Sequence, residues 1–148
     1  MYIHSDDTWK KHSSAWSGWT RVAAAPLFWH ALWLRNPYYL VAVIIFLVIN
    51  PRLFAAPKKI TNWMSKGVIG EKIYTGALIK KDFISTTLCI LMALVFFISM
   101  YAIWTHQLIL TVTTFFLAMT FKFWYLDRMV FLYEESKGDV VYNYRVKK

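Results

Sequence analysis

The chain has a single cysteine and none of the common sequence motifs of enzymes. Cys89 has no second cysteine to pair with, so an internal disulfide is excluded, and its place in an apolar run predicts packing as a small hydrophobic residue. A Walker loop, a glycine-rich dinucleotide fingerprint and a Gly-x-Ser-x-Gly elbow are absent, which leaves any catalytic residue unknown and indicates no cofactor. The four histidines lack the spacing of a zinc site, so no metal is predicted.

Acidic residues are scarce: 8 Asp and Glu stand against 17 Lys and Arg, and the net charge is +9. In a soluble protein this excess would suggest a nucleic-acid partner. Nearly all of the basic residues, however, precede the first apolar run, fill the central loop or follow the last run. By the positive-inside rule, both termini and the central loop are predicted to be cytoplasmic. We therefore expect anionic lipid head groups as partners, and no nucleic acid.

Charge is missing altogether from Phe83 to Trp104, a run of 22 residues. Together with 58% hydrophobic and 19% aromatic content, this excludes an ordinary soluble domain, because about 18 uncharged apolar residues in a row are typical of a transmembrane helix. The sequence predicts an all-α membrane protein with four transmembrane helices. The four apolar runs that predict them are Val22 to Leu34, Tyr38 to Ile49, Phe83 to Trp104 and Leu108 to Leu126.

The first two runs are only 13 and 12 residues long, too short to cross the hydrocarbon core alone. Two alternatives remain open. Complete helices would include the flanking residues, which the aromatic Trp16 and Trp19 favour, whereas a re-entrant hairpin would enter and leave on one side. In both, Arg35-Asn36-Pro37 forms the turn, with Asn tolerating a left-handed conformation and Pro starting the next helix. Thr105 to Gln107 joins the last two helices as antiparallel neighbours.

These features predict one helical membrane domain over residues 1–148. Asn50-Pro51-Arg52 ends the second run. Between Ile60 and Val68 the apolar residues share one face, which predicts a cytoplasmic interfacial helix, its cations toward lipid phosphates, that Gly67 and Gly70 interrupt. No cleavable signal peptide is evident. The predicted division is a cytoplasmic N-terminus (1–20), the first two helices (21–50), a cytoplasmic loop (51–82), the last two helices (83–135) and a cytoplasmic tail (136–148).

Five polar residues recur every seven positions through the last apolar run and so share one edge of a helix. The threonines either line a polar path or, more commonly, hydrogen-bond to carbonyls one turn earlier. Because the charged members fall at the cytoplasmic end, we interpret this polar edge as a packing seam ending in a charged site. Lys122, on the opposite side, either extends to head groups or pairs with a carboxylate on a neighbouring helix. The polar edge comprises His106, Thr113, Thr120, Asp127 and Glu134.

Three stretches carry a resemblance to a known family. They are Trp16-Ser17-x-Trp19-Thr20-Arg21, then Asn50-Pro51-Arg52-Leu53-Phe54 with Asn62 to Lys72, and finally Lys122-x-Trp124-x-Leu126-Asp127-Arg128 continuing to Glu134. In order and spacing they resemble a family of small prokaryotic integral membrane proteins, the domain-of-unknown-function family 6653. The chain departs from the family pattern at Ser14-Ala15, where Asn-Pro is expected. The resemblance implies a prokaryotic membrane protein, and it implies no activity.

All three stretches fall on the predicted cytoplasmic face, which brings seven charged residues within reach of one another. We hypothesise that they form a layer of ion pairs where the helices meet the central loop. Removing one partner of a pair would be costly wherever the pair is buried. The seven residues are Arg21, Arg52, Glu71, Lys72, Asp127, Arg128 and Glu134.

Three classes of function fit the sequence. The leading one is a structural or interaction protein of the inner membrane, whose cytoplasmic polar layer binds a lipid head group or a protein partner. The second is a small transporter or channel that uses the edge from His106 to Glu134 and needs a homo-oligomer to enclose a path. The third is a membrane enzyme acting on a lipid or quinone, with Asp127 or Glu134 as acid or base.

Overall fold

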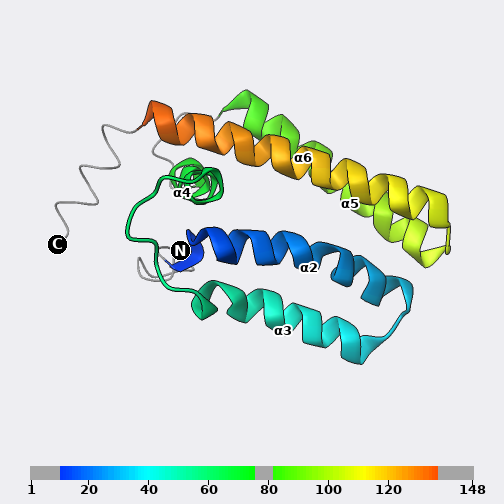
Figure 1. Ribbon diagram of the computed structural model, residues 1–148. Coiled ribbons are helices and arrows are strands. Elements are labelled where there is room, and N and C mark those ends of the chain that lie inside the picture. The colour runs from blue at the N-terminus through cyan, green and yellow to red at the C-terminus, as the bar shows by residue number, and fades with distance from the viewer. Residues whose placement is uncertain (1–10, 76–81, 137–148) are drawn as a thin grey trace.

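The structure, a computed structural model, describes residues 11–75 and 82–136 and is helical, as the sequence predicts. The predicted tail beyond residue 136 and the first ten residues of the predicted N-terminal segment lie outside the described residues. The helices, labelled as in Figure 1, are α2 (Ala15–Trp33), α3 (Pro37–Leu53), α4 (Trp63–Thr75), α5 (Phe83–Trp104) and α6 (Leu108–Glu135).

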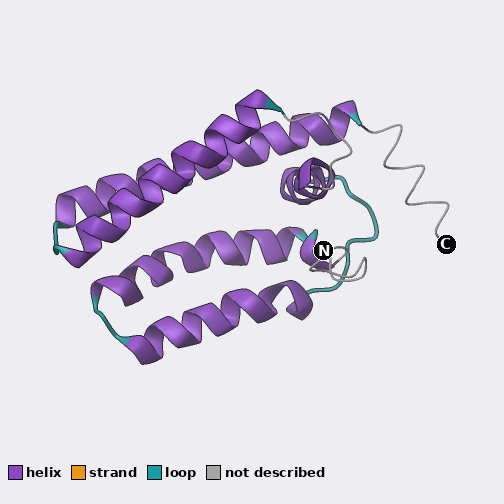
Figure 2. Ribbon diagram, turned by 180° about the vertical axis from the view of Figure 1, so that it is seen from behind, coloured by secondary structure: helices purple, strands orange, loops and turns teal. Residues whose placement is uncertain are grey.

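Two antiparallel hairpins, α2–α3 and α5–α6, lie one above the other, and α4 crosses between them at one end (Figures 1 and 2). The main packing interfaces are α4 with α6, α5 with α6 and α2 with α3, while α2 touches α4 and α5 less extensively. Both hairpin turns lie at the opposite end, each with one residue in a left-handed conformation, Arg35 (φ 49°) and His106 (φ 54°). Asn36, expected to take that conformation, instead accepts a hydrogen bond from the backbone N–H of Tyr39 and caps α3.

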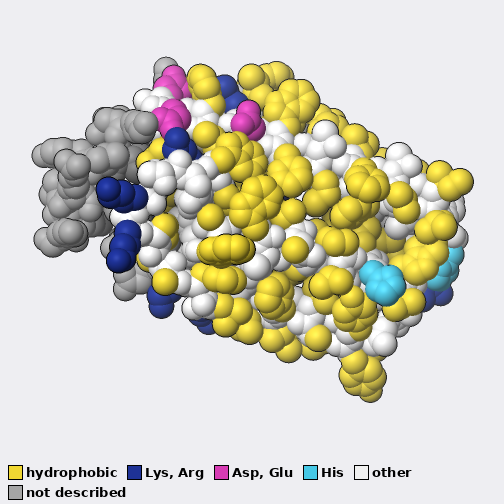
Figure 3. Space-filling model, viewed as in Figure 1, with side chains coloured by type: hydrophobic (Ala, Val, Ile, Leu, Met, Phe, Trp, Pro, Cys, Tyr) yellow, Lys and Arg dark blue, Asp and Glu magenta, His cyan; other side chains and the backbone are white. Residues whose placement is uncertain are grey.

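The outer surface of the hairpins is apolar, and the charged side chains gather at the α4 end (Figure 3). Phe97 is 69% exposed and Ile109 84% exposed, which is unusual for large apolar side chains in water. Two helices, α5 and α6, are long and apolar enough to cross a membrane, and α3 is a shorter apolar helix. The predicted run from Phe83 to Trp104 is confirmed, because α5 has the same bounds.

The first two helices are longer than the apolar runs that predict them. α2 has 19 residues and includes Trp16 and Trp19, and α3 has 17 and continues to Leu53. The apolar run ends at Ile49, but the helix continues through Asn50-Pro51-Arg52 and ends at Leu53, in agreement with the alternative of complete helices that include flanking residues. Pro51 lies in the last turn of α3, where its missing N–H costs one hydrogen bond and leaves most of the helix intact.

Asn50 fastens α3 to α2 from a fully buried position, with 0% of its surface exposed. The Ser17 hydroxyl donates to its Oδ1 at 2.8 Å, and its Nδ2 donates to Thr20 Oγ1, also at 2.8 Å. Ala24 and Ala31 follow Ser17 at seven-residue intervals and are buried too. Small side chains at this spacing allow close packing along one edge of α2. The hairpin thus satisfies its buried amide internally.

α4 is a continuous, largely buried helix, so the prediction that Gly67 and Gly70 interrupt it is wrong. Gly67 and Gly70, expected to weaken it, face α6. A Cβ on Gly70 would overlap the backbone of Met129, whereas one on Gly67 would meet Leu126 at 3.4 Å. Glycine disfavours an isolated helix, but here it lets two helix backbones approach closely, and the packing outweighs its low propensity.

Replacing Gly70 should therefore damage the α4–α6 contact far more than replacing Gly67. We expect Gly70→Ala to lower the free energy of unfolding by about 1–3 kcal/mol, the usual cost of overpacking. Gly67→Ala is the matched control, since it adds the same methyl to the same helix and should change stability by less than about 1 kcal/mol. Thermal unfolding in a mild detergent measures both. Equal midpoints for the two variants would contradict the close contact at Gly70.

Candidate functional site

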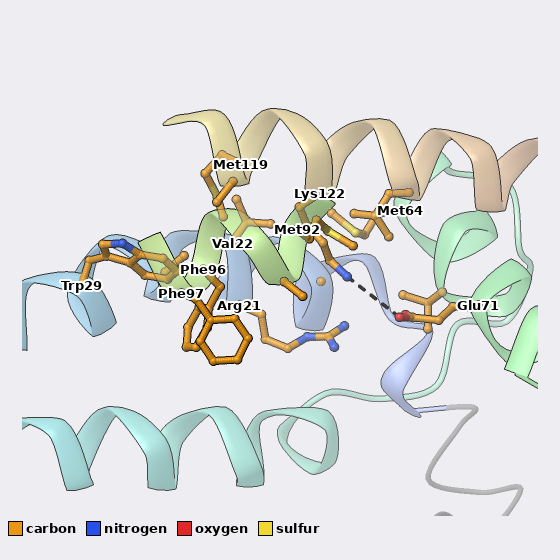
Figure 4. A pocket seen from close by; sticks show the side chains of 16 residues that line it. Arg21, Val22, Trp29, Met64, Glu71, Met92, Phe96, Phe97, Met119 and Lys122 are labelled. Atoms are coloured by element: carbon orange, nitrogen blue, oxygen red, sulfur yellow. Dashed lines mark ion pairs between the residues drawn. The ribbon is translucent and has the colours of Figure 1, made fainter. Parts of the chain in front are cut away.

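The two hairpins enclose a cavity of about 550 Å³ next to α4. Its walls come from four helices and are mostly apolar (Figure 4). Three charged side chains, Arg21, Glu71 and Lys122, converge at its α4 end. The other lining residues are Gly18, Val22, Ala25, Trp29, Met64, Val68, Met92, Ala93, Phe96, Phe97, Ala118, Met119 and Leu126.

The charged end joins residues from three helices. Lys122 of α6 lies with its Nζ 3.9 Å from Oε1 of Glu71 on α4. Arg21 of α2 donates through Nε to the Ser17 carbonyl at 3.0 Å and through Nη1 to Nε2 of His12 at 2.9 Å. The arrangement combines two cations and one carboxylate at the edge of an apolar space.

Trp29 of α2 lies at the end of the cavity away from the charges (Figure 4). Its indole N–H donates to Ser99 Oγ on α5 at 2.6 Å, and its ring packs edge-on against Phe96 and Phe115. Phe97, which also lines the cavity, is largely exposed on the outer surface of α5. The cavity therefore opens sideways, through the apolar surface of the molecule.

Beyond Trp29, the two hairpin turns are tied together. Arg35 donates to the Trp104 carbonyl at 2.6 Å, and its guanidinium lies 5.1 Å from the centre of the Trp104 ring. Trp33 and His106 pack edge to face with ring centres 4.8 Å apart. Each turn thus contacts the other hairpin, which closes the molecule at the end opposite α4.

An ion pair with two hydrogen bonds lies outside the cavity, between Asp82 and Arg128. Arg128 donates through Nε at 3.0 Å and through Nη2 at 2.9 Å to the two carboxylate oxygens. Asp82 also caps α5 by accepting from the Ser85 N–H at 2.9 Å. Its side chain is 13% exposed. The two hydrogen bonds from Arg128 hold the pKa of the Asp82 carboxyl well below its usual range.

A family of unknown function, DUF6653, matches residues 2–144 of the chain. The chain belongs to this family. The match includes all three stretches that carry the resemblance, together with every described helix and the cavity. No curated protein and no solved structure matches the chain. Membership in DUF6653 brings no named activity.

The charged residues predicted to meet in this DUF6653 chain are distributed over several contacts. Glu71 pairs with Lys122, Glu134 with Lys66 at 2.5 Å, and Arg128 with Asp82, so each of the three pairs with a residue outside the predicted set. Asp127 is exposed and accepts a hydrogen bond from the Trp63 indole at 3.0 Å. Arg21 lines the cavity, Lys72 is half-buried on α4, and Arg52 is exposed at the end of α3.

Sequence reasoning missed Asp82 and Ser85, although a signal was present. An Asp directly before a long apolar run matches the pattern of a helix N-cap. The pairing with Arg128, 46 residues away, has no local signal.

The middle of the polar edge of α6 faces outward, so the interpretation as a packing seam does not hold at Thr113 and Thr120. At its ends the edge does contact other helices, since His106 packs on Trp33, Asp127 accepts a hydrogen bond from Trp63 and Glu134 pairs with Lys66. Thr113 and Thr120 are exposed and donate to the carbonyls of Ile109 and Phe116, at 2.8 and 2.9 Å. The alternative of back-bonding to the preceding turn is therefore correct, and a threonine satisfied in this way can face an apolar surrounding. The buried face of α6 instead comprises Thr111, Thr114, Tyr125, Leu126, Met129, Leu132 and Tyr133.

Among the described residues, no group of three or more His, Cys, Asp or Glu side chains is placed to hold a metal ion. Neither Asp127 nor Glu134, the candidate acid or base, is among the described residues that line the cavity.

Asp82 and Asp127 provide a matched test of which carboxylate stabilises the fold. Asp82→Asn keeps a capping side chain but removes the charge that Arg128 binds, so we expect a loss of about 1–3 kcal/mol, between the values for exposed and buried pairs. Asp127→Asn keeps an oxygen for Trp63 and should change stability by less than about 0.5 kcal/mol.

The ion pair between Asp82 and Arg128 also predicts that stability depends on pH. Because folding depresses the pKa of Asp82, its contribution is complete above the unfolded value of about 3.9 and is lost as the pH falls below it. The difference between the unfolding midpoints of the parent and Asp82→Asn in detergent should therefore be largest at pH 7 and should narrow progressively as the pH falls from about 4 to 2, toward the depressed folded pKa. A constant difference between them across this range would show that the charge is not responsible.

Proposed function

We propose that this chain is a four-span membrane protein that holds a membrane amphiphile in the cavity between its two hairpins. The observation that carries the proposal is the cavity itself: apolar walls that open sideways, with Arg21, Glu71 and Lys122 gathered at one end (Figure 4). An amphiphile has the same two parts, an apolar chain and a polar head. Binding sites for small ligands typically have this composition, a mostly apolar lining with a few converging polar groups.

The four-span arrangement is supported by helix lengths. α2 and α3 have 19 and 17 residues, or about 28 and 25 Å, which a hydrocarbon core of about 30 Å accommodates with slight thinning. Trp16 is 72% exposed at one end and Trp104 73% at the other, as expected for aromatic side chains at the two interfaces of a membrane. Full helices are thus favoured over a re-entrant hairpin.

Orientation follows from the charges at the two ends. The α4 end carries the exposed Arg52, Lys58 and Lys59, whereas the far end carries Arg35. The positive-inside rule then places the α4 end and both termini in the cytoplasm, and the resemblance favours a prokaryotic inner membrane. The charged end of the cavity would lie just below the cytoplasmic head groups, where a lipid head can reach it.

The depth of the charged end agrees with this. Lys122 precedes Arg128 by six positions on α6, or about 9 Å along the helix axis. Arg128 and Asp82 mark the polar end of the second hairpin, so Lys122 lies inside the apolar layer but within reach of its boundary. Ionised side chains at that depth in a membrane are rare and usually have a function.

Filling the cavity tests the proposal. Ala25 lines the cavity and Ala42 is exposed on α3, so Ala25→Trp should block binding and Ala42→Trp is the matched control. We expect the parent and Ala42→Trp, purified in mild detergent, to retain a defined amphiphile near one per chain. Ala25→Trp should retain several-fold less. Mass spectrometry of solvent extracts measures this, and bulk lipid alone in all three samples would refute the proposal.

Cysteine labelling tests the orientation. Lys59→Cys and Gln107→Cys, each in a Cys89→Ala background, place an exposed thiol at opposite ends, whereas Ser65 is fully buried and unsuitable. A membrane-impermeant maleimide applied to intact cells should label Gln107→Cys, and it should reach Lys59→Cys only after permeabilisation. The reverse pattern would invert the proposed topology.

A further inference from the structure

The charges at the α4 end of the cavity indicate which kind of amphiphile fits, and this inference rests on the proposed function. Arg21 and Lys122 contribute two positive charges and Glu71 one negative charge, so the charged end carries a formal +1. These three residues come from α2, α6 and α4, the helices that meet there (Figure 4). The net charge of +1 therefore comes from side chains that lie on three separate helices and project toward one another.

The contact between Glu71 and Lys122 leaves room for an additional anion. Their closest atoms are 3.9 Å apart, longer than the roughly 2.8 Å of a hydrogen-bonded ion pair. Arg21 uses two of its five N–H groups in its hydrogen bonds to Ser17 and His12. An anionic head beside Arg21 and Lys122 would therefore meet both cations while Glu71 stays in place.

We infer that the cavity selects an amphiphile with one acyl chain and a singly charged anionic head, and that Glu71 sets this charge preference. A monoanion brings the charged end to neutrality. A neutral head would leave a net positive charge at membrane depth, and a dianion would leave a net negative charge beside Glu71. Both are unfavourable where the surroundings are apolar, because uncompensated charge is costly there.

The cavity volume matches one acyl chain. A methylene group takes up no more space than a water molecule, about 30 Å³ in the liquid, so about 550 Å³ holds roughly 18 methylene groups. Met64, Met92 and Met119 line this space, and their flexible thioether side chains adapt to an apolar chain. The singly charged head can be the carboxylate of a free fatty acid or the phosphodiester of a single-chain phospholipid.

Three probes with one chain and different heads test the charge preference: oleyl sulfate (monoanion), oleyl phosphate (mostly dianion at pH 8.5) and oleyl alcohol (neutral). Titration calorimetry of the purified full chain in one detergent measures the dissociation constants. We expect the sulfate to bind at least about tenfold more tightly than the other two. Oleate and oleoyl lysophosphatidylglycerol then distinguish a carboxylate from a phosphodiester as the natural head.

Glu71→Gln raises the charge of the site to +2 and should reverse the order, so that the phosphate binds about tenfold more tightly than the sulfate. Glu135→Gln removes a charge from an exposed position of α6 and should leave the order unchanged. Lys122→Gln, which lowers the charge to zero, should make the alcohol the tightest probe and provides a second test if Glu71→Gln does not fold.

The outcomes separate the two proposals. If no probe binds the parent chain, or if Ala25→Trp binds as well as the parent, the proposed function fails together with the inference. If the probes bind in the cavity but show no preference for charge, or if Glu71→Gln and Lys122→Gln leave the order unchanged, only the charge selection by Glu71 is overturned.

Discussion

The distance between the two hairpins depends on α4, which lies between them at one end. On one side it meets α6 through Gly70, where the two backbones touch, and on the other it meets α2, where Met64 lies against Gly18. Trp19, Trp63 and Phe123 extend the same junction as a cluster of three rings from α2, α4 and α6. Without α4 as a spacer, the apolar faces of the hairpins would close on each other, and the cavity beside it would disappear.

The far end has the opposite role, since it holds the hairpins together. Trp29 reaches Ser99, Arg35 reaches the Trp104 carbonyl, and Trp33 packs on His106. These contacts use single polar groups that find one partner each on the other hairpin. In an apolar surrounding an unsatisfied polar group costs several kcal/mol, so such contacts also fix the register of the two hairpins. Separation at one end and attachment at the other together define a lateral cavity.

Apolar run length predicted α5 to the residue and located both turns, because an uncharged run and a short polar connection are local signals. The sequence also indicated where the charges concentrate. It could not show that Gly67 and Gly70 are contact points, because a glycine reads as a helix breaker until the partner backbone is known. The outward direction of the middle of the polar edge was not predictable for a similar reason. Thr113 and Thr120 have the same spacing whether they face a neighbour or the outside, and only the position of α4 and α5 decides between the two.

The candidate site itself was only partly predictable. Arg21 and Glu71 stood among the seven charged residues expected to meet. One alternative for Lys122 was a carboxylate on a neighbouring helix, and Glu71 is that partner. No pattern indicated that the three would meet at the end of a cavity. They lie on different helices, and their convergence depends on the angle at which α4 crosses. Asp82 shows the same limit of prediction. Its capping of α5 has a local signature, while its pairing with Arg128 depends on how α5 and α6 pack in the hairpin.

Each hairpin contains a polar contact of its own near the α4 end. Asn50 finds Ser17 and Thr20 within the first hairpin, and Arg128 finds Asp82 within the second. A bilayer admits a helical segment readily when its polar groups are already satisfied. If both hairpins span a membrane, as proposed, these internal contacts allow them to be inserted during synthesis as two successive units. The docking of α4 against Met129 then becomes the assembly step that joins them, and it can occur only after α6 has emerged from the ribosome.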